Sequence, residues 1–138
     1  MTDREFLAAF EDGSLPEDRF HHADHVRAAW LILREGSPAV ALERFSAALK
    51  QFAAAKQKDS LYHETITWAY LLLVNERMER TGRALAWEEF AASNPDLMTW
   101  RPSALDRYYK PETLRSDLAR RAFVLPDRAG SDLNSGLT

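Results

Sequence analysis

The chain has 138 residues, which suits one compact domain with a single core. Hydrophobic residues make up 46% of it and charged residues 28%, an ordinary balance for a globular protein. The formal net charge is −3, so the chain lacks the broad basic face that nucleic-acid binding requires. The sequence has no cysteine, which excludes disulfides, thiolate metal sites and cysteine nucleophiles and leaves nitrogen and oxygen as ligand atoms.

Neither the start of the chain nor its apolar runs indicate export or membrane insertion. The stretch MTDREFLAAFEDG is acidic and lacks a long apolar segment, so we expect no signal peptide. The longest apolar run, residues 68–74, is far shorter than the ~20 residues that a membrane span needs. We therefore expect a cytoplasmic monomer or small homo-oligomer that acts on a small-molecule substrate and binds neither nucleic acid nor membrane.

Glycine, proline and the spacing of apolar residues predict helices over residues 3–11, 22–35, 38–55, 60–81, 87–93 and 111–121. Gly36 predicts the end of the second helix, and Ser37 followed by Pro38 is a typical start for the third. No long stretch alternates apolar and polar residues, and no hairpin dipeptide joins two such stretches. These patterns predict an all-α, single-domain helical bundle of about five to six helices over residues 1–128, followed by a flexible tail at 129–138.

The lengths of the predicted connections indicate how the helices run. About two residues join the second helix to the third and about four join the third to the fourth, and such short connections make neighbouring helices antiparallel. The core should therefore run up, down and up, with the second and fourth helices parallel. The connection at residues 94–111, NPDLMTWRPSALDRYYKP, is expected to pack over one end of the bundle. We call it the aromatic connection.

Histidines fall in the first turns of both parallel helices, so they should meet at one end of the bundle. His22 and His25 are three residues apart and therefore share a helix face. His63 shares a stripe with Ile66 and Tyr70 on the fourth predicted helix, so we expect it to point inward. Helix N-termini disfavour imidazolium, which keeps histidines in the neutral form that binds metals. The sequence thus predicts that His22, His25 and His63 hold one divalent ion, which could be Zn, Fe, Mn, Ni or Cu.

Glu64 adjoins His63 and is the predicted catalytic residue, acting as general base on a metal-bound water. It could also be a metal ligand, or a first-turn glutamate that stabilises the helix dipole. The segment HETIT is not the HExxH zinc signature, because Thr67 stands at the second histidine position. His21 is expected to cap its helix together with Asp24.

Three further residues, Tyr62, His21 and Thr67, could hydrogen-bond to the metal ligands and so orient them.

The segments FHHADHVRAAWLIL, YHETITWAYL and LARRAFVLPD together resemble a family of small uncharacterised bacterial helical proteins. That family has an F/W-x-H-x-x-H start, a Y-H-E-T-I-T segment and a closing A-R-x-x-F-V-x-P-D. The resemblance spans residues 20–127 and matches His22, His25, Tyr62, His63 and Glu64. It implies no particular activity.

Three functions are compatible with these features. The first is a metal-dependent enzyme, hydrolytic or oxygen-using, with the histidines as ligands. The second is a metal-free enzyme in which His63 and Glu64 serve as acid and base. The third is a non-enzymatic interaction module, with a structural histidine cluster and the aromatic connection between Trp100 and Tyr109 as partner surface.

Overall fold

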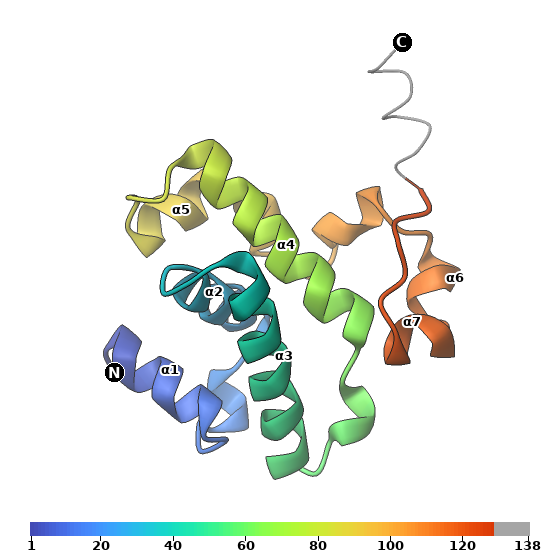
Figure 1. Cartoon of the computed structure of the whole chain (residues 1–138), viewed down its shortest axis with the longest axis horizontal. Coiled ribbons are helices and arrows are strands. Elements are labelled where there is room, and N and C mark those ends of the chain that lie inside the picture. Colours follow the sequence, from blue (N-terminus) through green and yellow to red (C-terminus); the bar gives the residue numbers. More distant parts are fainter. Residues whose placement is uncertain (129–138) are drawn as a thin grey trace.

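The computed structural model describes residues 1–128, and this part of the chain is built from helices and turns (Figure 1). Its seven α-helices are α1 (Asp3–Glu11), α2 (His22–Leu33), α3 (Pro38–Ala55), α4 (Glu64–Thr81), α5 (Trp87–Ser93), α6 (Pro111–Leu114) and α7 (Asp117–Arg121). Short 3₁₀ turns lie at Glu17–Arg19, Asp59–Leu61, Pro95–Leu97 and Ala104–Arg107. Residues 1–128 contain no strand, which confirms the predicted all-α fold. The predicted tail, residues 129–138, lies outside the described residues.

The bounds of α1, α3 and α5 agree with the predicted ones. At the start of α3 the Ser37 hydroxyl accepts the backbone N–H of Val40, and Pro38 occupies the first helical position. Helix α2 ends at Leu33 rather than at residue 35. The helix ends there in a 3₁₀-type hydrogen bond, in which the Glu35 N–H donates to the carbonyl of Ile32, three residues earlier.

Two predicted helices differ from the observed ones. Helix α4 begins at Glu64 and not at residue 60, because the 3₁₀ turn at Asp59–Leu61 precedes it and His63 caps it. The helix predicted over residues 111–121 is two helices, α6 and α7. Ser116 separates them, since its hydroxyl donates to the Thr113 carbonyl and accepts the Ala119 N–H that starts α7.

Helix α2 lies in the middle of the core and packs against both α3 and α4, while α1 covers α3 (Figure 1). Its residues from Ala28 to Leu33 are buried on all sides, as expected for a helix without a polar face. Helix α4 crosses the molecule and contacts α5 near one end and α7 near the other. None of the helices in residues 1–128 is long and apolar enough to cross a membrane.

The segment after α7, residues 122–128, is an extended strap held by buried hydroxyl groups. The fully buried Thr65 hydroxyl donates to the Ala122 carbonyl at 2.8 Å and accepts the Val124 N–H at 3.1 Å. The Tyr109 hydroxyl donates to the Val124 carbonyl at 2.7 Å. Asp127 accepts the N–H of Lys110, the residue before α6, at 3.0 Å. The Thr65 bonds fasten this strap to the first turn of α4, and the bonds from Tyr109 and Lys110 fasten it to the aromatic connection.

Candidate functional site

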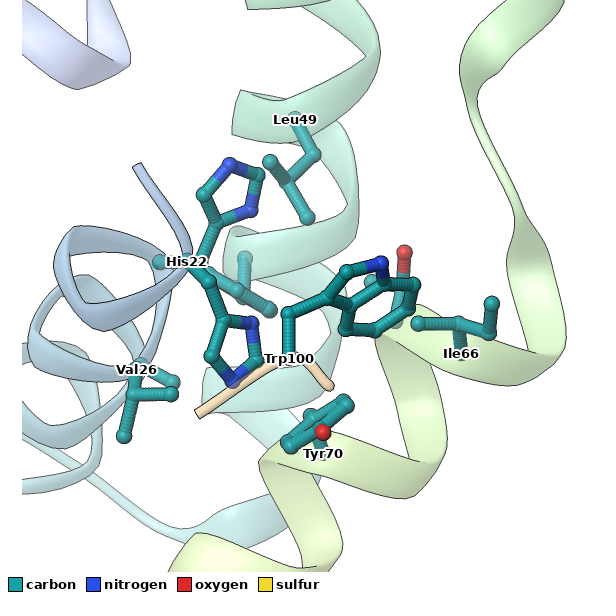
Figure 2. A pocket seen from close by; sticks show the side chains of 10 residues that line it. His22, Val26, Leu49, Ile66, Tyr70 and Trp100 are labelled. Atoms are coloured by element: carbon teal, nitrogen blue, oxygen red, sulfur yellow. The ribbon is translucent and has the colours of Figure 1, made fainter. Parts of the chain in front are cut away.

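The first turns of α2 and α4 line one cavity of about 300 Å³. We call it the histidine cavity, and Figure 2 shows part of its lining around Trp100. The residues that line it are His22, His25, Val26, Ala29, Phe45, Leu49, Ile66, Thr67, Tyr70 and Trp100. Because α2 and α4 both bring their N-terminal turns to this cavity, their starting ends lie together, as the short connections predicted.

His22 is half-buried at the first position of α2 and is bound to the aromatic connection. Its Nε2 lies 2.9 Å from the Leu97 carbonyl, to which it donates, so Nδ1 carries the lone pair of the neutral ring. The ring lies edge-on to Tyr70, with centroids 4.9 Å apart, and 5.4 Å from the Trp100 ring. Burial lowers the pKa of His22, while the bond to Leu97 opposes this shift. His22 is therefore neutral near pH 7.

His25 lies one turn further along α2, with its ring stacked on Phe20. The two ring centroids are 3.9 Å apart and the rings are inclined by 21°. Phe20 is itself held between Phe10 and Phe52, at 4.8 and 4.7 Å. Burial, reinforced by the neighbouring His22, lowers the pKa of His25 to about 4. Among residues 1–128 nothing is hydrogen-bonded to its ring, so a neutral imidazole borders the cavity with both nitrogens available.

His63 has a different environment from that predicted, because it is the N-cap of α4 and not a residue of its first turn. Its Nδ1 accepts the Ile66 N–H at 3.1 Å, so Nε2 carries the proton and donates to the Leu114 carbonyl at 2.7 Å. Burial lowers the pKa of His63, and the nearby Arg120 adds to this effect. Both ring nitrogens are thus bonded to the backbone, and in this arrangement neither offers a lone pair to an ion.

Glu64 lies beside another hollow, of about 390 Å³, that is also lined by Leu42, Lys50 and Trp68. Its Oε1 accepts hydrogen bonds from the Tyr62 hydroxyl at 2.6 Å and from Trp68 Nε1 at 3.1 Å. Burial, followed by the bond to Glu64, raises the pKa of Tyr62 to about 12. His63 and Glu64, the predicted acid–base pair, therefore both have their hydrogen-bond partners outside the histidine cavity.

The two remaining predicted site residues are His21, which is exposed, and Thr67, which is buried. The His21 side chain is 75% exposed, and the Asp24 carboxylate accepts the His21 N–H at 2.9 Å, which forms the predicted cap. Thr67 is buried and lines the histidine cavity, while its hydroxyl donates to the His63 carbonyl at 2.7 Å.

The structure brings His22 and His25 to one cavity and leaves His63 out of its lining. Among residues 1–128, no group of three or more His, Asp or Glu side chains is arranged to hold a metal ion. A site made of His22, His25 and His63 would require His63 to release at least one of its backbone bonds.

The histidine cavity adjoins two outer hollows. The entrance hollow, of about 460 Å³, shares with it His25, Leu49, Ile66, Thr67 and Trp100. The arginine hollow, of about 740 Å³, is lined by Arg101, Arg115 and Arg120 together with His63, Ile66 and Trp100. Trp100, which is 42% exposed, therefore borders all three spaces.

Sequence reasoning had not placed Trp100 or the three arginines at the site. Trp100 belongs to the aromatic connection, whose expected packing over one bundle end was the available signal. The arginines come from three separate segments, and no spacing in the sequence relates them. In comparisons with models of protein families, with curated proteins and with solved structures, the chain has no match.

Proposed function

We propose that this protein binds a small, flat, mainly apolar molecule in the histidine cavity. The observation that carries this proposal is an apolar cavity of about 300 Å³ bordered by aromatic rings and by two neutral imidazoles. Cavities of this size and lining are typical of small-molecule sites. Aromatic walls such as Tyr70 and Trp100 favour a ring that can stack or meet them edge-on.

The imidazoles give the cavity a means of recognising one polar substituent. His22 offers the Nδ1 lone pair because its other nitrogen donates to Leu97. His25 offers one N–H and one lone pair because its ring is neutral and unbonded. A hydroxyl group of the ligand could therefore both donate and accept inside an apolar space, where such bonds are strongest.

Filling the cavity should abolish binding. Leu49 is half-buried on α3 and lines both the histidine cavity and the entrance hollow, so Leu49→Trp should occupy the space. With 2-naphthol as the probe, we expect calorimetric titration of the full chain to give binding that Leu49→Trp weakens ~10-fold or more.

The matched control is Leu42→Trp, a change of the same size on the same helix beside the other hollow. This variant should bind 2-naphthol like the unmodified protein. Absence of binding by the unmodified protein, or equal losses in the two variants, would contradict the proposal.

The second candidate function is binding of a divalent metal ion by His22 and His25. It keeps the predicted metal-dependent enzyme but reduces the protein ligands from three histidines to two. The favouring observation is that two neutral imidazoles, three residues apart on one helix face, line the same cavity. Water or the ligand would complete the coordination shell.

Elemental analysis of protein purified without a tag tests this candidate. We expect metal content to fall sharply in His22→Ala and His25→Ala and to be unchanged in His21→Ala, whose side chain is exposed. A specific site would be excluded if the unmodified protein remained metal-free after exposure to Zn, Fe, Mn, Ni and Cu in turn. Equal losses of metal content in the His21, His22 and His25 variants would exclude it as well.

A further inference from the structure

The arginine hollow carries an excess of positive charge on an acidic chain. Arg101, Arg115 and Arg120 line it, and all three are exposed. The same lining holds one carboxylate, that of Asp106, whose Oδ2 accepts the Ser103 N–H at 3.2 Å. Since the whole chain has a net charge of −3, the gathering of cations at this one place favours an anionic ligand group.

Within the described part of the chain, these three arginines are not ion-pair partners. Within residues 1–128, none of them forms a salt bridge, whereas Arg27, Arg44, Arg77, Arg80 and Arg83 do. Arg120 Nη1 donates to the Ser60 carbonyl at 2.8 Å, which orients that guanidinium beside the hollow. An arginine has five N–H donors, so Arg120 keeps further donors for a ligand.

The arginine hollow and the histidine cavity are close enough to serve one molecule. Ile66 and Trp100 line both spaces. The entrance hollow shares Arg120 with the arginine hollow and His25 with the histidine cavity. A ligand whose ring lies in the histidine cavity against Trp100 would therefore direct a substituent past the indole toward the arginines.

We propose that the ligand of the histidine cavity is a small organic carboxylate. Its apolar ring occupies the cavity, and its carboxylate lies in the arginine hollow among Arg101, Arg115 and Arg120. Guanidinium groups bind carboxylates through paired, charge-assisted hydrogen bonds, which are stronger than neutral ones. This inference rests on the proposed function and adds to it the charge of the ligand and the residues that select it.

Two probes with the same ring and hydroxyl group, one charged and one neutral, test the inference. Calorimetric titration of the full chain compares 6-hydroxy-2-naphthoate with its neutral amide, which has the same ring and hydroxyl group. We expect the carboxylate to bind ~10-fold more tightly at low salt, and this preference to shrink as salt is added. In the triple variant Arg101→Gln/Arg115→Gln/Arg120→Gln the two probes should bind within ~2-fold of each other, because the charge-assisted bonds are lost.

The control is Arg121→Gln, which removes an exposed arginine from the end of α7 that does not belong to the hollow lining. This variant should keep the full preference for the carboxylate. Equal affinities of the two probes for the unmodified protein, or equal loss of preference in all variants, would overturn the carboxylate inference and leave cavity binding intact. Failure of both probes to bind would instead overturn the proposed function itself.

Discussion

The free energy of unfolding is expected to fall by about 3 kcal/mol between pH 7 and pH 4 through His25 alone. In the folded protein burial lowers the pKa of this residue to about 4, against an ordinary value of 6.5. The unfolded chain therefore takes up a proton between these values while the folded protein does not. The stabilisation is complete above the unfolded-state pKa and is lost as the pH falls through the folded-state pKa, at ~1.4 kcal/mol for each pH unit.

Urea unfolding at a series of pH values in this window checks the prediction. His25→Phe keeps a flat ring against Phe20 and cannot be protonated, so its stability should depend less on pH by about the predicted 3 kcal/mol. The lowered pKa values of His22 and His63 act in both proteins and cancel in the comparison. His21→Ala should retain the full dependence. Parallel pH profiles for His25→Phe and the unmodified protein would show that His25 is not held neutral by its surroundings.

A histidine that resists protonation matters for the proposed site. At neutral pH both His22 and His25 keep a free lone pair, which a hydroxyl group or a metal ion can use. The helix dipole predicts this neutrality from the sequence, whereas burial is its main cause in the structure. Burial acts because Phe20 and Trp100 exclude water from the two rings.

The sequence predicts the fold in most respects because its signals are local. Ser37 with Pro38 marks the start of α3, and the short connections on either side of that helix bring the starts of α2 and α4 together. The sequence therefore predicts His22 and His25 near the first turn of α4. The cap formed by His21 and Asp24 was readable for the same reason.

The features that the sequence does not predict are the start of α4 and the hydrogen-bond partners of His22 and His63. A 3₁₀ turn at Asp59–Leu61 delays the start of α4 and makes His63 its cap, and neither propensity nor periodicity distinguishes a cap from a first-turn residue here. Glu64 is then the first residue of α4, and its carboxylate accepts the hydrogen bond of Trp68 Nε1. The partners Leu97 and Leu114 lie 75 and 51 residues away from His22 and His63 and use backbone carbonyls, which leave no trace in the sequence.

Replacing His63 by Ala is expected to lower the free energy of unfolding by about 1 to 3 kcal/mol. The change removes the acceptor for the Ile66 N–H at the start of α4, and loss of such a cap costs ~0.5 to 2 kcal/mol. It also removes the donor to the Leu114 carbonyl, which joins α4 to the end of α6. Urea unfolding at pH 7 measures the loss.

His63→Asn separates the two bonds, because asparagine is a good N-cap but is too short to reach Leu114 as the imidazole does. We expect this variant to recover most of the cap contribution and to remain less stable than the unmodified protein. Both variants should bind 2-naphthol nearly as the unmodified protein does, since His63 borders the entrance hollow and not the histidine cavity. If His63 instead served a metal ion, His63→Ala and His63→Asn would reduce bound metal strongly while changing the metal-free stability little. The same two variants, measured for stability and for metal content, therefore decide between a residue that closes the bundle end and one that binds an ion there.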